Sequence, residues 1–117
     1  MNRQEAEARG RRGERIAAWW LRLKGWRILD KRVRTPVGEI DLIARRGKQV
    51  AFVEVKTRRT IEEAELFLDE YQLRRVAAAA DALSHDYVAQ GYDVRIDAVL
   101  WAPGSRPYHM ENVWQGW

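Results

Sequence analysis

Two carboxylates and a lysine on neighbouring strand-like segments are the residues of this sequence best suited to chemistry. Asp41 lies in an alternating run at residues 39–44, and Glu54 and Lys56 lie in another at residues 50–57. A short basic run containing a glycine separates them, which is typical of a hairpin turn. With an even number of loop residues the three side chains share one face of the sheet, whereas an odd loop without a bulge would separate them.

The register of the hairpin decides how close the two carboxylates come. A two-residue loop at 46–47 would set Asp41 opposite Phe52 and diagonal to Glu54, and a four-residue loop at 46–49 would set it directly opposite Glu54. In either case the carboxylates would lie about 5–8 Å apart. Carboxylates at that spacing repel each other unless a cation lies between them. Oxygen ligands without nearby His or Cys favour Mg²⁺ or Mn²⁺.

Lys56 follows Glu54 by two residues, so it lies on the same side of its strand. There its ammonium would point at a metal-activated water and a scissile phosphate, and would stabilise the negative charge that grows on the phosphate. A plainer interpretation is a ladder of surface ion pairs, which would contribute at most about 1 kcal/mol to stability. The apolar neighbours of these residues predict a largely covered hairpin instead, which favours a metal site.

The segments that would position these residues follow the order α-β-β-β-α-β. Helical spacing of apolar residues predicts helices at 3–24 and 61–90, and alternation predicts strands at 26–34, 39–44, 50–57 and 94–101. This order is typical of an α/β domain with one mixed sheet and a helix on each side. The 117 residues have room for one domain, with its core at about 10–101 and a tail at 102–117. Trp114 and Trp117 in that tail would cover a sheet edge or a dimer surface.

Composition excludes several classes of protein. The chain has no cysteine, which excludes a disulfide framework, a thiolate zinc site and a cysteine nucleophile. Its longest purely apolar run, Ile16–Leu21, is far shorter than a membrane span of roughly 20 residues. Its N-terminus is too charged for a signal peptide. We therefore expect no membrane partner and a location in the cytoplasm.

Positive charge is concentrated in the first half of the chain. Residues 1–59 contain 17 Lys and Arg against 7 Asp and Glu, a net charge of +10, whereas residues 60–117 contain 4 basic and 10 acidic residues, a net charge of −6. Such asymmetry favours a polyanionic partner, with nucleic acid as the first candidate. The candidate phosphate contacts are Arg11, Arg12, Arg58 and Arg59, for which the alternative is an ordinary solvated surface.

Four short motifs, taken in order, resemble one known family. They are Gly13-Glu14, Gly38-Glu39-Ile40-Asp41-Leu42-Ile43-Ala44, Phe52-Val53-Glu54-Val55-Lys56-Thr57-Arg58 and Arg95-Ile96-Asp97. Over about residues 10–100 they resemble the YraN family of small bacterial proteins, and the spacing of Asp41 and Glu54-Val55-Lys56 is similar to the signature of the PD-(D/E)xK nuclease superfamily. That signature alone is weak, but the complete string is specific. The resemblance implies a restriction-endonuclease-like fold and a similarity to archaeal Holliday-junction resolvases.

The resemblance also implies roles for individual residues. Asp41 and Glu54 would be catalytic metal ligands, Lys56 would be the catalytic lysine, and Glu14 would be a third metal ligand. An ion pair within the first helix is the plainer alternative for Glu14. Gln72 falls where the superfamily often carries a polar residue near the active site. The chain departs from the family pattern after its third strand, where an acidic segment replaces a glycine-containing loop and a lysine.

Three functions are compatible with these features. The favoured one is a metal-dependent endonuclease that hydrolyses phosphodiesters in structured or branched DNA, and a two-fold symmetric junction would require a homodimer. The first alternative is a non-catalytic nucleic-acid-binding module with the nuclease fold. The second is an interaction protein that binds a partner through its acidic second half and its tryptophan-containing tail.

Overall fold

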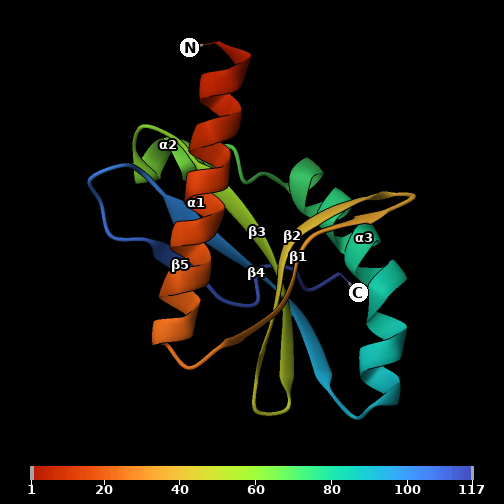
Figure 1. Ribbon diagram of the computed structural model, residues 1–117. Helices are drawn as coiled ribbons and strands as arrows, with labels where there is room; N and C mark the ends of the chain where they lie inside the picture. Colours follow the sequence, from red (N-terminus) through yellow and green to blue (C-terminus); the bar gives the residue numbers. More distant parts are fainter. Residues whose placement is uncertain (1, 117) are drawn as a thin grey trace.

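A mixed sheet of five strands forms the centre of the molecule, and helices cover both of its faces (Figure 1). The computed structural model describes residues 2–116. Along the chain the elements are α1 (Arg3–Leu23), β1 (Arg27–Thr35), β2 (Gly38–Arg46), β3 (Gln49–Thr57), α2 (Ile61–Leu66), α3 (Glu70–Ala89), β4 (Asp93–Trp101) and β5 (Tyr108–Met110). The α/β class and the order α-β-β-β-α-β are confirmed, with the second helix divided in two and a short fifth strand added.

The strands lie side by side in the order β1-β2-β3-β4-β5. Tight turns join β1 to β2 and β2 to β3, so these neighbours are antiparallel, whereas α2 and α3 form the crossover that makes β4 parallel to β3. The central strand β3 is buried over Val50–Val53 and becomes partly exposed at Glu54–Lys56. The carboxyl end of β3 is therefore where polar side chains leave the core.

Alternation along the strands divides the core into two layers. Ala17, Ala18 and Leu21 of α1 pack with Leu42, Ala44, Ala51 and Val53, while Val76, Ala79 and Ala80 of α3 pack with Ile43, Phe52 and Ile96. Successive side chains of a strand point to opposite faces, so each central strand packs against α1 with one face and against α3 with the other. This confirms the expected helix on each side of the sheet. None of the helices described in residues 2–116 is long and apolar enough to cross a membrane.

The β1–β2 hairpin bends away from the rest of the sheet and reaches over α3 (Figure 1). The register of β1 shifts between Ile28 and Asp30, as at a β-bulge, and such bulges bend a strand. As a result Ile40 packs in the α3-side layer, whereas Leu42 of the same strand packs in the α1-side layer. The pairing of β2 with β3 stops at Leu42↔Val53. The bend therefore opens the sheet between β2 and β3 at one end.

The prediction of one continuous helix at 61–90 is wrong. The helix α2 ends at Leu66, and α3 begins only at Glu70. Asp69 has an extended backbone, and its side chain accepts a hydrogen bond from the N–H of Gln72 at 2.9 Å. An aspartate that caps a new helix in this way competes with continuation of the previous one. The break places Gln72 in the first turn of α3.

The segment after β4 returns along the sheet. Its strand β5 pairs antiparallel with β4, and further on the N–H of Val113 donates to the carbonyl of Ile96 at 2.8 Å. Trp114 packs against the α3-side layer, so it covers core within its own chain. Trp117, also expected to cover an edge or a dimer surface, lies outside the described residues.

Candidate active site

The turn between β2 and β3 sets two carboxylates face to face. It consists of residues 47–48, with its glycine in the left-handed region at φ 61°. The strands pair from this turn up to Leu42↔Val53, and the same register continued by one residue sets Asp41 opposite Glu54. The expected four-residue loop at 46–49 implied the same pairing of Asp41 with Glu54. In the structure Arg46 and Gln49 also pair, so only two residues remain in the turn. The loop is even, so the two carboxylates share a face.

The end of the β2–β3 ladder orients Asp41. Asp41 lies one residue beyond the last backbone pair, and its Oδ2 accepts a hydrogen bond from the N–H of Val55 at 2.8 Å. The carboxylate therefore takes the place of a backbone acceptor where the two strands separate. Its second oxygen remains for another partner, such as a cation or Glu54.

Burial and mutual repulsion perturb both carboxyl groups. Burial, together with the charge of Glu54, raises the pKa of Asp41 to about 8. Burial also raises the pKa of Glu54, although the Lys56 ammonium acts in the opposite direction. Each carboxyl group also acts on the other, which raises the pKa of Asp41 and lowers that of Glu54. Two carboxyl groups whose negative charge is disfavoured by burial have the electrostatic properties of a divalent metal site.

Lys56 lies beside this pair on the same strand. Its Nζ is 3.7 Å from Oε1 of Glu54, and the two side chains are 15% and 12% exposed. The single ammonium compensates for one of the two carboxylates. The pair with Asp41 thus retains an excess of negative charge, next to a lysine that is held in place by partial burial.

Close packing of α1 against β3 brings Glu14 to the edge of the site. A Cβ at Gly13 would collide with the side chain of Thr57 at the end of β3, so glycine permits this approach. Glu14 accepts a hydrogen bond from Nε of Arg32, on β1, at 2.7 Å. Its charge also contributes to the raised pKa of Asp41. Glu14 is therefore close enough to act on the carboxylate pair while an arginine holds its side chain.

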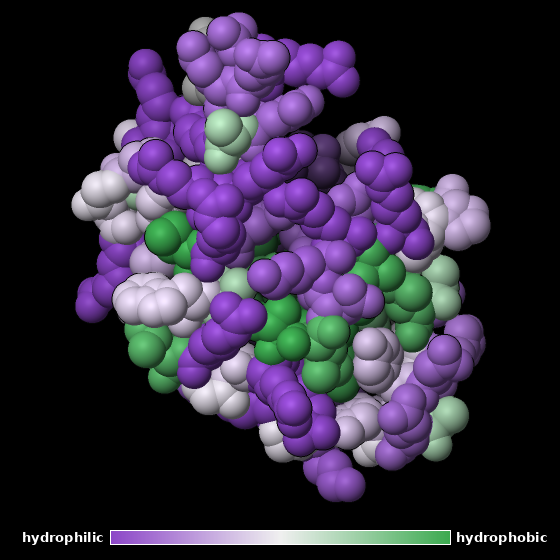
Figure 2. Space-filling model, in the orientation of Figure 1, coloured by the Kyte–Doolittle hydropathy of each residue, from purple (hydrophilic) through white to green (hydrophobic). Residues whose placement is uncertain are grey.

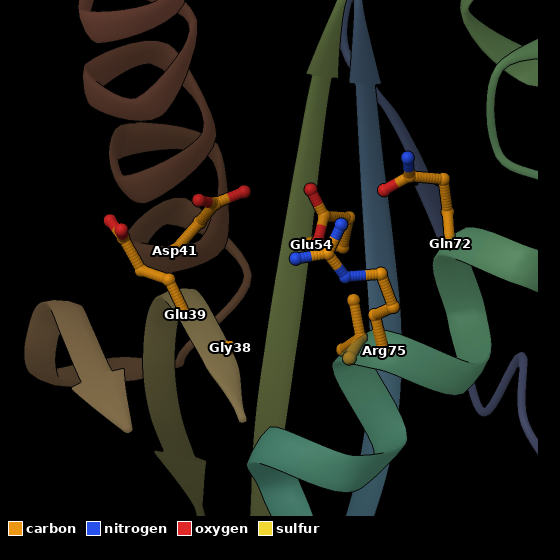
Figure 3. A pocket seen from close by; sticks show the side chains of 7 residues that line it. Gly38, Glu39, Asp41, Glu54, Gln72 and Arg75 are labelled. Carbon is orange, nitrogen blue, oxygen red and sulfur yellow. The ribbon is translucent and has the colours of Figure 1, made fainter. Parts of the chain in front are cut away.

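A cleft of about 240 Å³ opens between the separated ends of β2 and β3 and the first turns of α3. Its lining consists of Gly38, Glu39, Asp41, Glu54, Gln72, Arg75 and Val76. Figure 3 shows that Asp41, Glu54 and Gln72 contribute to it from three different elements. Gln72, which was predicted to lie near the site, reaches the cleft because the cap at Asp69 starts α3 just before it.

The four arginines predicted to contact phosphates have different surroundings, and their role stays a prediction. Arg11 lines a second cleft, on the α1 side of the site. Arg12 lies over the indole ring of a β4 tryptophan at 5.3 Å, and Arg58 lies over a phenylalanine ring that follows α2 at 4.3 Å. Arg59 is exposed after β3. Of the four, Arg11 is the one that lines a cleft beside Glu14.

Two further arginines belong to the site and were not predicted. Arg32 has φ 49°, a left-handed conformation that is uncommon outside glycine. Its sequence signal is the charged run Asp30-Lys31-Arg32, which interrupts the apolar alternation of its strand. Arg75 follows Gln72 by nearly one helical turn and lines the same cleft. It could be recognised only once the start of α3 was known.

A second polar cluster surrounds Asp97, on β4, which is completely buried. Its Oδ2 lies 2.7 Å from Nε2 of His109 and accepts a hydrogen bond from Arg95 at 3.1 Å, and its Oδ1 accepts the N–H of Asn112 at 2.9 Å. Within the described residues, Asp97, His109 and Glu111 form the one group of three His or acidic side chains with ligand atoms within 4.8 Å of one another. Arg95 also donates to Glu111 at 3.1 Å, so a guanidinium already compensates for both carboxylates. Sequence spacing does not indicate this cluster because it joins β4 to the segment around β5.

The whole chain is similar to proteins of several bacteria. The profile of the uncharacterised protein family UPF0102 matches residues 13–100. A UPF0102 protein of Erythrobacter litoralis is 63% identical over 115 residues, which cover 98% of this chain and 99% of that protein. A UPF0102 protein of Rhizorhabdus wittichii is 59% identical over 117 residues, which cover 99% of each chain. These matches confirm the resemblance found in the sequence, and the chain belongs to the uncharacterised protein family UPF0102, the YraN family.

Proposed function

We propose that this protein is a divalent-metal-dependent nuclease that hydrolyses phosphodiester bonds in structured or branched DNA, in the cytoplasm. The observation that carries the proposal is the facing pair of Asp41 and Glu54, with Lys56 3.7 Å from the second carboxylate. Two carboxylates and a lysine beside a cleft are the groups that metal-assisted hydrolysis of a phosphodiester requires.

The carboxylate pair fits a small, hard cation. Its donors are oxygen atoms, and burial together with the charge of Glu54 raises the pKa of Asp41, a cost that a bound cation would reduce. Asp41 and Glu54 would hold Mg²⁺ or Mn²⁺, and Glu14 would complete the ligand set from α1. When bound, the ion would lower the pKa of a coordinated water and neutralise charge on the phosphate.

Lys56 would act on the scissile phosphate. Its ammonium carries three N–H donors and is held beside Glu54 by partial burial. A positive charge that is fixed before the substrate arrives stabilises the charge that develops on the phosphate without further reorganisation. Removal of this group is therefore expected to reduce the cleavage rate by about 10²–10³-fold.

The basic first half of the chain would bind the DNA backbone. Figure 2 shows hydrophilic residues gathered over the N-terminal half of α1, at the top of the view. Contacts to phosphates position a nucleic acid without reading its sequence, which suits a substrate recognised by its structure. A two-fold symmetric junction would engage two copies of the chain, so a homodimer is part of the proposal.

The test is cleavage of a labelled panel of DNAs: single strand, duplex, flap and four-way junction. Wild-type protein is compared with Lys56→Ala in Mg²⁺, in Mn²⁺ and in EDTA. The matched control is Lys48→Ala, which removes an exposed lysine at the opposite end of the same hairpin. We expect metal-dependent cleavage by the wild type and the control, and its loss in Lys56→Ala. Equal rates for all three proteins would overturn the mechanism.

A non-catalytic nucleic-acid-binding module is the second candidate, and the concentration of positive charge in residues 1–59 favours it. It predicts salt-dependent DNA binding that survives Asp41→Asn and Glu54→Gln. It also predicts that the wild type cleaves no member of the panel. Metal-dependent cleavage that is lost with the carboxylates would exclude it.

A further inference from the structure

A second cleft, of about 290 Å³, lies between α1 and β1 beside the carboxylate site. Its lining residues are Arg11, Glu14, Arg15, Lys31 and Arg32. Arg11 and Arg15 are four residues apart, so they project from one face of α1. Four cationic side chains surround a single carboxylate, and that carboxylate is the one that would complete the metal site. The cleft is therefore strongly basic and adjoins the proposed reaction centre.

Arg32 joins this basic cleft to the carboxylate site. The pairing of β1 with β2 on both sides of Arg32 places it opposite Asp41, yet its backbone is left-handed at φ 49°. Its side chain extends to α1, where Nε donates to Glu14 at 2.7 Å. Left-handed conformations of residues other than glycine are strained, and such strain gathers at functional sites. Within residues 2–116 its terminal amino groups have no hydrogen-bond partner, so they can bind an anion in the cleft.

From this arrangement we infer that the basic cleft binds a backbone phosphate of the nucleic acid next to the scissile phosphate, and that Arg32 couples the two positions through Glu14. The inference rests on the proposed function for the identity of the scissile phosphate. The phosphate in the cleft would accept hydrogen bonds from Arg11, Arg15 and Lys31, and from the free end of the Arg32 guanidinium.

The size and surroundings of the cleft favour a polymer over a free anion. Its volume of about 290 Å³ admits more than a single phosphate, and hydrophilic residues gather over the N-terminal half of α1, the helix that contributes two of its arginines (Figure 2). A strand that runs from this cleft to Asp41 passes the Glu14–Arg32 pair. The two phosphates would then be fixed relative to each other, which aligns the scissile bond.

The first test measures binding of a fluorescent four-way junction by anisotropy in EDTA, where no cleavage occurs. The double variant Arg15→Ala/Lys31→Ala is compared with Arg74→Ala/Arg106→Ala, which removes two exposed charges outside both clefts and outside the basic first half of the chain. We expect the Kd of the cleft variant to rise about tenfold or more and its salt slope to fall by about one. The control should change less than about threefold. Equal weakening by both variants, or none by the cleft variant, would overturn the inference.

Competition with inorganic phosphate distinguishes a site for a nucleic-acid backbone from a site for a small free anion. At constant ionic strength, replacement of chloride by phosphate should leave junction binding unchanged, because a single phosphate does not span the cleft. Specific displacement of the junction by phosphate would identify a small-anion site and overturn the assignment to a polymer. Because this assay needs neither metal nor cleavage, a negative result in the cleavage panel would remove the proposed function and leave this binding result standing.

The coupling by Arg32 has a signature that a merely structural role does not give. Arg32→Asn suits the left-handed backbone and removes the guanidinium. Junction binding in EDTA should weaken about tenfold, whereas Mn²⁺ binding without DNA, measured by calorimetry, should strengthen severalfold because a nearby positive charge is lost. Arg32→Lys should restore much of the junction binding. Weakening or no change of Mn²⁺ binding in Arg32→Asn would overturn the coupling.

Discussion

Two buried carboxylate clusters on the same sheet are held in opposite ways. At Asp97, burial alone would raise the pKa, but hydrogen bonds from His109 and the Asn112 N–H, together with Arg95, bring it below its usual value. At Asp41, burial and the charge of Glu54 raise the pKa to about 8, and one backbone N–H opposes them. One carboxylate is therefore compensated within the protein although it is completely buried, and one partly buried pair is not.

From this difference we infer a structural role for Asp97, and it supports the role proposed for the Asp41–Glu54 pair. The donors around Asp97 come from β4 and from the segment around β5, and they compensate for its charge within the protein. The Asp41–Glu54 pair lines a cleft, and its excess negative charge can be removed by protons or by a cation. A perturbed carboxylate beside a cleft is thus a better guide to function than a cluster of ligand-type side chains alone.

Asp97→Ala should have the largest effect on stability. Removal of the carboxylate leaves the partly buried Arg95 with the more exposed Glu111 alone as its counter-charge and takes the acceptor from the buried His109, and we expect the free energy of unfolding to fall by about 3–5 kcal/mol. Urea unfolding at pH 7 measures this loss. Asp93→Ala, at the exposed start of the same strand, is the matched control and should change stability by less than about 0.5 kcal/mol. A loss below about 1 kcal/mol for Asp97→Ala would contradict its structural role.

Asp41→Asn should change stability in the opposite direction. It removes a charge that the folded state accommodates poorly, so we expect stabilisation of about 1–3 kcal/mol at pH 8 in EDTA together with loss of metal-dependent cleavage. Urea unfolding and the cleavage panel supply the two readouts. Destabilisation of the variant at pH 8 would contradict the proposed electrostatic cost of the pair.

The pH dependence of wild-type stability provides a second check of this comparison. The pKa of Asp41 is raised from 3.8 to about 8 on folding, so between these values the folded state holds a proton that the unfolded state lacks. Stability in EDTA should therefore fall as pH rises through this window, and the fall should be smaller in Asp41→Asn. The pKa of Asp97 is lowered on folding, so the effect of this group on stability runs in the opposite direction. The stability that it contributes should be lost as pH falls below about 3.8.

Divalent cations should offset part of the electrostatic cost of the carboxylate pair at the candidate active site. At pH 8, Mn²⁺ at ten times its Kd should stabilise the wild type by about 1.4 kcal/mol, because the ion binds the folded state alone. Binding should also release protons from the carboxylate pair. Thermal unfolding and calorimetry in two buffers of different ionisation enthalpy measure the two effects. Equal stabilisation of Asp41→Asn and Glu54→Gln would place the ion elsewhere, with Asp97 as the first alternative.

Glu39→Gln should have the smallest effect. Glu39 lines the cleft, but its side chain is 44% exposed and lies 3.8 Å from an exposed arginine. We expect a change in stability below about 0.5 kcal/mol and a cleavage rate within about threefold of the wild type. A loss comparable to that of Lys56→Ala would make Glu39 a further ligand and enlarge the site beyond the facing pair.

The sequence predicted those features that depend on short-range periodicity. Alternation identified the strands, and an even loop was enough to bring Asp41 and Glu54 to one face. Helical spacing gave α1, and the chain order implied a helix on each side of the sheet. These features follow from residues close together in the chain, so that no long-range contact needs to be known.

Other features depend on competition between two local structures or on contacts between residues far apart in the chain. The break before α3 arose because the cap formed by Asp69 competes with helical continuation, which composition alone did not reveal. The left-handed backbone of Arg32 is compensated by its bond to Glu14 on another element. His109 and Asp97 meet because β5 folds back on β4, and no spacing rule specifies that pairing.

The link between His109 and Lys24 has a consequence for the order in which this protein matures. Lys24 follows α1 directly, and its Nζ lies 2.7 Å from Nδ1 of His109, a contact that spans 85 positions of the chain. The end of α1 is thus tied to a segment that is synthesised much later. A growing chain on the ribosome can form α1 and the two β-hairpins early, but this contact waits until β5 has been made. Removal of β5 would therefore release the end of α1 as well as the edge of β4.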